Sequence, residues 1–274
     1  MPRPASHETS YRPVQGLSRG LSLVRAMNIA GRPVDVRDLS AGTGLHRTTV
    51  RRLLETLVTE GYVSRSPSGD GYQLTLQVRD LSEGFTDQEW IASIAAPAMG
   101  QLMEQVKWPS DLTTLDGSAM RIRESTHRFS SLSFERAMVG RRLPLMFTAS
   151  GRAYLAACDN RERAALTKLM VADGGAQGAC AADPRLLQLT IDRVRRNGFA
   201  NAEGEWRKSS PAGAIALPIM GAGRVLACLN VAYLRRSMTV TEAAQDLLPP
   251  LRDAVNAIEL QISDQAGLEK PQRL

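Results

Sequence analysis

The sequence offers one serine motif that could serve nucleophilic catalysis. Gly16-Leu17-Ser18-Arg19-Gly20 matches the G-x-S-x-G pattern, in which a strained turn after a strand holds the serine beside a histidine base. Here a proline-containing arm precedes the motif, and apolar residues recur around it at the three- and four-residue steps of a helix. We therefore expect Ser18 to be a helical residue with no catalytic role.

The histidines and cysteines lack the spacing of a metal site or a disulfide framework. His7, His46 and His127 fall in separate predicted elements, so they do not form a cluster of ligands. The cysteines are odd in number, widely spaced and without a paired motif: Cys158, Cys180 and Cys228. We expect each cysteine to be a small buried apolar residue in a reducing compartment, the cytoplasm.

One glycine-rich segment resembles the start of a cofactor loop. Gly42-Thr43-Gly44 begins the G-x-G-x-x-G pattern of dinucleotide-binding proteins, but Arg47 occupies the third glycine position and no strong strand precedes it. The segment is therefore predicted to be a turn. The sequence thus predicts no assembled active site, no metal and no cofactor.

Length, composition and charge restrict the class of protein. The chain has 274 residues, enough for two domains, and 43% of them are hydrophobic, so it can bury a core. It contains no apolar run long enough to span a membrane, and its first residues do not form a secretory signal. The net charge is +6, and all but four of the 34 basic residues are arginines. Arginine suits phosphates and guanine edges, but a GC-rich genome gives the same bias, so the charge permits a nucleic-acid partner without establishing one.

The first secondary-structure elements that the sequence predicts are three helices and a hairpin. We expect helices from Val14 to about Ala30, from Asp35 as the N-cap to about Gly42, and from Leu45 to Glu60. A hairpin follows, with strands at 62–65 and 72–74. The apolar faces predicted for the helices are, in chain order, Leu17, Leu21, Val24 and Met27; Val36 and Leu39; and Val50, Leu53, Leu54, Leu57 and Val58.

This order and spacing predict a winged helix-turn-helix, whose third helix enters the major groove of DNA. Opposite its apolar face that helix presents threonine and arginine, which can donate to base edges and phosphates. We expect base contacts from Arg47, Thr48 and Arg52. Phosphate contacts are expected from a second set: His46, Thr49, Arg51, Arg19 on the first helix and Arg65 on the wing.

The second half of the chain predicts an α+β domain of about 170 residues. A helix at 88–106 should kink or divide at Pro97, and the segment at 171–183, rich in Gly and Ala, is predicted to be a mobile loop. The predicted strands are 111–115, 120–123, 214–219 and 225–233. The other predicted helices are 149–157, 161–170, 184–197 and 241–263.

These elements divide the chain into five segments. We expect a flexible arm at 1–12, a DNA-binding domain at 13–75 and a linker helix at 76–88. An effector-binding and oligomerisation domain should cover 89–264, followed by a polar tail at 265–274.

Several of these segments resemble the IclR family of bacterial transcription regulators. The resemblance rests on Leu45-His46-Arg47-Thr48-Thr49-Val50-Arg51-Arg52-Leu53-Leu54-Glu55-Thr56-Leu57 and on Glu60-Gly61-Tyr62-Val63 in the first half. In the second half it rests on Val139-Gly140-Arg141-Arg142-Leu143-Pro144, Thr148-Ala149-Ser150-Gly151 and Ile215-Ala216-Leu217-Pro218-Ile219. The resemblance covers almost the whole chain beyond the arm. It implies a multidomain α+β protein with a winged helix-turn-helix, a linker helix and a GAF-like effector-binding domain.

Within the family, residues 126–130 and 132–140 resemble activators of aromatic-acid catabolism of the 3-(3-hydroxyphenyl)propionate type. The resemblance implies a small aromatic carboxylate as effector, double-stranded promoter DNA as partner, and a homodimer or homotetramer. It also implies an effector site at Ala149, Ser150, Asn201 or Glu203, Ala214, Asn230 and Ala232. This chain has Phe147 near the site, where many relatives carry alanine or histidine. The shape of the site's wall at Phe147 is therefore expected to differ from theirs.

An aromatic acid also needs an apolar slot and a few donors. The residues suggest a slot of Phe129, Phe134, Phe147 and Trp206, with Ser150, Asn230 or Arg128 orienting the ligand, although ordinary core packing explains those aromatics equally well. Three functions remain open: an effector-responsive activator, which contacts RNA polymerase or alters promoter geometry; a repressor that the effector releases; and an enzyme with an appended DNA-binding domain. The missing catalytic constellation weighs against the last.

Overall fold

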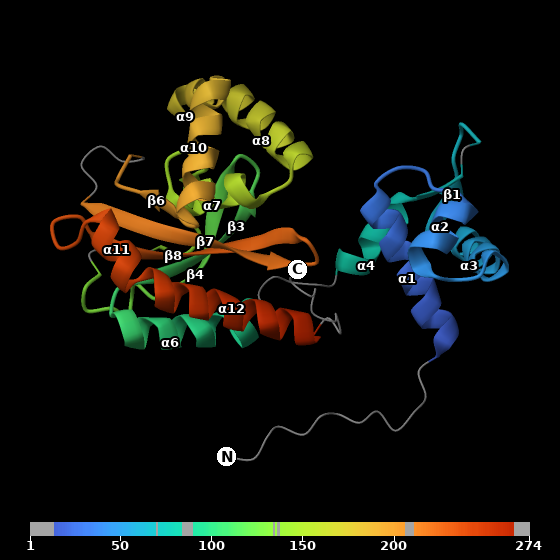
Figure 1. The fold of residues 1–274 in the computed structure, drawn as a ribbon, viewed down its shortest axis with the longest axis horizontal. Coiled ribbons are helices and arrows are strands. Elements are labelled where there is room, and N and C mark those ends of the chain that lie inside the picture. The colour runs from blue at the N-terminus through green and yellow to red at the C-terminus, as the bar shows by residue number, and fades with distance from the viewer. Residues whose placement is uncertain are drawn as a thin grey trace, which may run out of the picture. The chain divides into compact units, whose positions relative to one another are not determined.

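The computed structural model describes residues 14–69, 71–83, 90–133, 135, 138–205 and 211–265. The chain divides into two compact units, Met1–Thr86 and Asp87–Leu274, which are described separately below (Figure 1). The expected arm at 1–12 and residues 266–274 of the expected tail lie outside the described residues. No helix in the described part of the chain is long and apolar enough to cross a membrane.

The N-terminal unit is a winged helix-turn-helix, as the sequence predicts. Its elements are α1 (Gln15–Ala30), α2 (Val36–Thr43), α3 (Arg47–Thr59), β1 (Val63–Arg65), β2 (Tyr72–Leu74), a 3-10 turn η1 (Leu76–Arg79) and α4 (Asp80–Glu83). β1 and β2 pair in antiparallel fashion. Residues 84–88 of the expected linker helix lie outside the described residues.

Local chemistry explains where these short elements begin and end. The Asp35 carboxylate accepts a hydrogen bond of 2.7 Å from the Asp38 backbone N–H and so caps α2. Gly44, at a φ of 68°, ends α2 in the left-handed region. Gly71 lets the wing dock, because a Cβ there would lie 2.5 Å from the Val34 carbonyl oxygen. Tyr72 and Val34 exchange backbone hydrogen bonds of 2.9 Å beside it.

The buried face of α1 differs from the one predicted. Leu17 and Leu21 are 64% and 46% exposed, whereas Leu23 is completely buried and Met27 nearly so. At 100° per residue, Leu23 and Met27 lie roughly a third of a turn around the helix from Leu17 and Leu21. The prediction for Leu17 and Leu21 was therefore wrong, because two apolar faces on one helix give the same three- and four-residue steps.

The C-terminal unit is built on a six-stranded sheet in which every neighbouring pair is antiparallel, in the order β5-β4-β3-β8-β7-β6. Its strands are β3 (Ser110–Asp116), β4 (Ala119–Ser125), β5 (Arg142–Pro144), β6 (Ala200–Ala202), β7 (Ala212–Gly221) and β8 (Arg224–Leu234). The four predicted strands are confirmed. The two that the sequence does not predict, β5 and β6, have three residues each, too few to show a period of two.

Helices cover both faces of this sheet (Figure 1). They are η2 (Ile91–Ala95), α6 (Ala96–Val106), α7 (Ala149–Ala157), α8 (Asn160–Asp173), α9 (Gly175–Ala181), α10 (Pro184–Asn197), α11 (Val240–Asp246) and α12 (Leu248–Gln265). On one face of the sheet, α6 and α12 pack against the strands and share a hydrophobic core with them. On the other face, α7 packs on β7 and β8 and lies between the sheet and α8, α9 and α10.

Two expectations about helices needed correction or refinement. The prediction of a loop at 171–183 is wrong. Helix α8 runs to Asp173, and α9 follows after Gly174. Its small residues serve packing instead: a Cβ on Gly178 would lie 2.7 Å from the Met170 carbonyl oxygen. The single helix expected at 241–263 is two helices, α11 and α12.

The break expected at Pro97 is confirmed. A π-turn, η2, directly precedes α6, and the Ala96 backbone N–H donates to the Ile91 carbonyl. Proline supplies no N–H at the next position, so the regular ladder of hydrogen bonds is interrupted there.

Candidate functional site

The first candidate site is the exposed face of α3 in the N-terminal unit. Val50 and Leu54 are completely buried, and they orient the helix so that Arg47, Arg51 and Arg52 are exposed on its other side. Within the described part of the chain, none of these three guanidinium groups has an ion pair or hydrogen bond. Their donors are therefore available to phosphates and base edges.

The other residues expected at this site are also at the surface, but several are already engaged. His46 is the N-cap of α3, with Nδ1 lying 2.9 Å from the Thr48 hydroxyl. Arg19 donates 3.0 Å to the Gln15 side chain. Arg65 pairs with Glu55 at 3.3 Å and lies over the Tyr72 ring. Their interactions fix these side chains locally and leave fewer donors for a partner.

A basic hollow adjoins α3. Arg37 of α2 and Arg47 and Arg51 of α3 line a surface depression of about 550 Å³, which Gly71 and Tyr72 of the wing close on one side. Three guanidinium groups around one hollow can attract the phosphates of a nucleic acid. The sequence reasoning missed Arg37. The available signal was its position one residue into α2, on the opposite side from buried Leu39.

The second candidate site is a cavity in the C-terminal unit, of about 80 Å³, and of about 630 Å³ when its open mouth is included. Its described lining residues come from β3, β5, β6, β7 and β8, from the first turn of α7, and from His127, Glu135, Met138 and Gly204. Seven of its fifteen lining residues are alanine or glycine, which leaves room between the sheet and α7: Ala149, Ala202, Gly204, Ala212, Gly213, Ala214 and Ala232.

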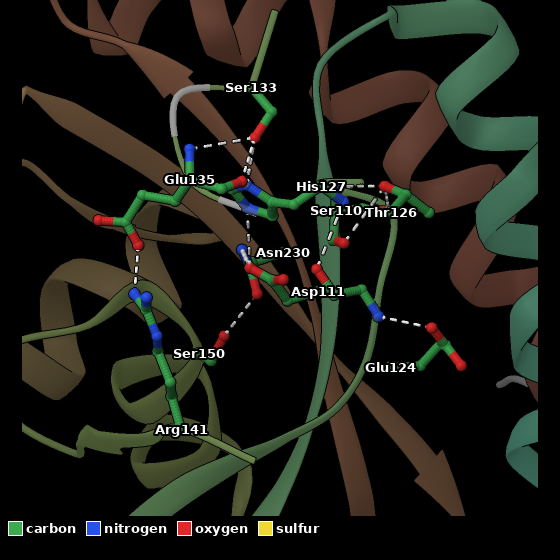
Figure 2. A network of polar contacts seen from close by, with 11 residues as sticks. Ser110, Asp111, Glu124, Thr126, His127, Ser133, Glu135, Arg141, Ser150 and Asn230 are labelled. Atoms are coloured by element: carbon green, nitrogen blue, oxygen red, sulfur yellow. Dashed lines mark hydrogen bonds and ion pairs between the residues drawn. The ribbon is translucent and has the colours of Figure 1, made fainter. Parts of the chain in front are cut away.

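Several residues that line this cavity are joined by a chain of polar side-chain contacts (Figure 2). Ser150 donates 3.1 Å to the Asn230 amide oxygen, and the Asn230 amide nitrogen donates 3.2 Å to Asp111 Oδ2. His127 Nε2 lies 3.5 Å from the same Oδ2. The side chains of all four residues line the cavity and are buried from solvent.

His127 is held on its other side as well. Its Nδ1 lies 2.7 Å from the Ser133 hydroxyl and 3.0 Å from the Glu135 carbonyl oxygen. Burial alone lowers the pKa of His127, but the hydrogen bond and charge of Asp111, together with the carbonyl and charge of Glu135, outweigh burial, so its pKa is raised. Glu135 also lines the cavity and forms an ion pair with Arg141.

The effector residues expected from the sequence divide into two groups. Five line the cavity: Ala149, Ser150, Ala214, Asn230 and Ala232. Four lie outside its lining: Phe147, Arg128, Asn201 and Glu203. Among the described residues, the lining holds no arginine or lysine.

The aromatic slot does not take the expected form in the described part of the chain. Phe129 is 59% exposed, with the Arg128 guanidinium 4.4 Å from its ring centre. Phe147 packs against the core below α7. The remaining two aromatics of the expected slot, Phe134 and Trp206, lie outside the described residues.

Sequence reasoning missed three ionisable residues of the cavity: Asp111, His127 and Glu135. Asp111 carried a usable signal, because an ionisable residue inside a run of buried strand residues needs a special reason to be there. The pairing of Asp111 with His127 joins β3 to the segment that follows β4, and no local pattern reveals it.

The motifs with catalytic resemblance have structural roles. Ser18 lies within α1, as expected, and its hydroxyl faces the Val14 carbonyl of the preceding turn. The three cysteines are free thiols. Burial raises the pKa of Cys158 to about 11 and raises that of Cys228 further, so neither thiol is an activated nucleophile. No metal-binding group of His, Cys, Asp or Glu occurs among the described residues.

A winged helix-turn-helix with an arginine-rich third helix, on the same chain as an α+β unit, defines a DNA-binding transcriptional regulator. The chain belongs to the IclR family: residues 16–67 match the IclR helix-turn-helix domain, and residues 84–260 match the bacterial transcriptional regulator IclR C-terminal domain. This family consists of transcriptional regulators and not of enzymes.

Two relatives are named after the genes that they regulate. The chain is 30% identical over 237 residues to the Pca regulon regulatory protein of Pseudomonas putida, covering 86% of this chain and 79% of the relative. It is 24% identical over 259 residues to the p-hydroxybenzoate hydroxylase transcriptional activator of Acinetobacter baylyi, covering 89% and 90%.

A solved structure agrees in fold. An IclR homologue from Microbacterium hydrocarbonoxydans, crystallised with 4-hydroxybenzoate, superposes with a TM-score of 0.52 over 91% of this chain and 99% of the homologue, at 20% identity.

Proposed function

We propose that this protein is an activator of an aromatic-acid catabolic operon, responding to a small aromatic carboxylate of the 3-(3-hydroxyphenyl)propionate type. The observation that carries the proposal is the small-residue cavity beside the first turn of α7, with polar groups at one end. Its support from relatives is the activator named for p-hydroxybenzoate hydroxylase and the homologue that binds 4-hydroxybenzoate.

On DNA, the third helix supplies the sequence-reading contacts. We assign base contacts to Arg47, Thr48 and Arg52 and phosphate contacts to Arg51, Thr49, His46, Arg19 and Arg65. Arg37 joins the phosphate set because it lines the basic hollow with Arg47 and Arg51. The DNA-binding domain then covers 13–75, the linker 76–88 and the effector domain 89–264.

In the cavity, the acid's carboxylate meets the first turn of α7. The backbone N–H groups of Ala149 and Ser150 have no partner within the helix, and the helix dipole favours a negative charge there. Since the lining has no arginine or lysine among the described residues, these backbone N–H groups take the role first considered for Arg128. The alanines of β7 and β8 then pack against the aromatic ring.

The regulator acts as a homodimer or homotetramer, and the effector shifts its arrangement on DNA by binding one state more tightly than the other. The exposed apolar strip of α1, Val14, Leu17 and Leu21, supports self-association, because such strips are seldom left in water. Activation follows through RNA polymerase contact or altered promoter geometry. The whole cycle takes place in the cytoplasm.

A promoter-reporter strain tests the direction of control. Under the proposal, deleting the gene silences the reporter even when the aromatic acid is supplied. A reporter that becomes constitutively active after the deletion would instead establish a repressor. Turnover of the acid by purified protein would revive the reading of an enzyme with an appended DNA-binding domain.

A further inference from the structure

Asp111 is a buried carboxylate that uses only one of its two oxygens. The residue is 2% exposed, and its Oδ2 both accepts from Asn230 and faces His127. Within the described part of the chain, Oδ1 has no hydrogen-bond partner. Since Asp111 is one of the residues that line the cavity, this free acceptor lies beside the cavity.

A buried carboxylate oxygen without a donor is costly, so native proteins keep such groups where something else supplies the donor. The neighbouring side chains are already committed. The Asn230 amide nitrogen donates to Oδ2, and its amide oxygen accepts from Ser150. Of the fifteen described lining residues, seven are alanine or glycine, which carry no side-chain donor.

We propose that Asp111 Oδ1 accepts a hydrogen bond from a hydroxyl group of the effector, so that the cavity selects hydroxylated aromatic acids over their deoxy counterparts. This inference rests on the proposed function of the cavity. It orients the ligand, with its carboxylate at the first turn of α7 and its ring hydroxyl at β3. His127 already faces Oδ2, so the ligand need supply a neutral donor and not a second cation.

Analogues of the acid can distinguish the effect of a hydrogen-bond donor from the effect of ligand size. A site that holds a hydroxyl by a buried polar group rejects the analogue that lacks it, because the protein group is left unpaired. A methyl ether keeps the oxygen but loses the donor, and it should be rejected as well. The deoxy acid is smaller than the hydroxy acid, so poor binding of the deoxy acid cannot come from a clash.

Isothermal titration of the full chain with three acids tests this: 3-(3-hydroxyphenyl)propionate, 3-phenylpropionate and 3-(3-methoxyphenyl)propionate. For the unaltered protein we expect the hydroxy acid to bind at least about tenfold more tightly than either analogue. Asp111→Ala should reduce the ratio of hydroxy to deoxy affinity to near one. Asp116→Ala makes the same change at the other end of β3, outside the cavity lining, and should leave the ratio unaltered.

The outcomes separate this inference from the proposed function. Equal affinity of the unaltered protein for the hydroxy and deoxy acids overturns the role of Asp111 and leaves an aromatic-acid regulator. Binding of none of the three acids overturns both. Because the affinity ratio of the unaltered protein is itself decisive, the test holds even if Asp111→Ala fails to fold; Asp111→Asn, which keeps the volume, should then show a reduced ratio.

Discussion

The exposed face of α3 and the cavity of the C-terminal unit are both polar, yet they are assembled in different ways. The α3 face comes from one segment of thirteen residues, and its arginines lie in water without partners in the described part of the chain. The cavity takes Asp111, Ser150 and Asn230 from three separate elements, and buries them in mutual contact.

This difference governs what a substitution should do. A surface arginine contributes to a partner's binding and little to stability, because its charge is fully hydrated in the free protein. A residue at the cavity contributes to stability as well, because its neighbours are buried and depend on it. Substitutions in the two regions should therefore differ in what they change.

Adding a methyl group to a glycine should have opposite effects in the two units. A Cβ at Gly151 of α7 would overlap the backbone of Leu145, so Gly151→Ala should destabilise the protein by about 3 kcal/mol. In α1, a Cβ at Gly20 would meet only Leu53 at 4.0 Å, and Gly20→Ala should stabilise by about 0.5–1 kcal/mol through helix propensity. Urea denaturation measures both, and a neutral Gly151→Ala would refute the close approach of α7.

Arg52→Ala should weaken binding to the specific promoter by about 1–3 kcal/mol and relax the base preference, because a bidentate base contact is lost. Fluorescence anisotropy with promoter and random duplexes measures this, at several salt concentrations. Arg25→Ala, at an exposed position of α1, is the matched control and should change little. Equal losses on promoter and random DNA would demote Arg52 to a phosphate contact.

Ser150→Ala removes a buried hydrogen bond and leaves the Asn230 amide oxygen without its donor. The expected loss of stability is about 1 kcal/mol. The comparison is Ser22→Ala in α1, whose hydroxyl donates to the Arg19 carbonyl at an exposed position and should contribute less than about 0.5 kcal/mol. If both substitutions cost the same, burial does not distinguish the two regions.

The pH dependence of stability provides the smallest effect. The pKa of folded His127 is raised, so protonated His127 stabilises the fold fully below its unfolded pKa of about 6.5. This stabilisation disappears as the pH rises through the folded value. The difference in unfolding free energy between the unaltered protein and His127→Gln should therefore shrink from about pH 6 upward. A difference that stays constant with pH would show that His127 does not titrate in this range.

The same contrast explains what the sequence predicts. The apolar stripe of α3 and its opposite arginine face follow from periodicity alone, and the capping residue Asp35 and the terminating Gly44 are readable locally. The cavity residues Ser150 and Asn230 were predicted through the resemblance and as polar groups that could orient an acid, not from periodicity. Neither periodicity nor the resemblance predicted the pairing of Asp111 with His127, because that pairing depends on how β3 and the segment after β4 meet in space.

Errors arose where local patterns are ambiguous. Leu17 and Leu21 form a helical stripe as regular as the buried one, and periodicity cannot tell which stripe faces the core. Gly174 and Gly178 suggest a loop by composition, whereas the second lets α9 pack closely on α8. Both errors concern tertiary packing and not the intrinsic preference of the residues.

The central claim is that a ligand in the cavity controls how the N-terminal unit binds DNA. The most direct measurement is the promoter affinity of the full chain, by anisotropy, with and without saturating 3-(3-hydroxyphenyl)propionate. The account predicts a change of several fold, together with the same factor in the acid's affinity when promoter DNA is present. If the acid binds but both affinities stay the same, the cavity does not communicate with the DNA-binding unit and the account is contradicted.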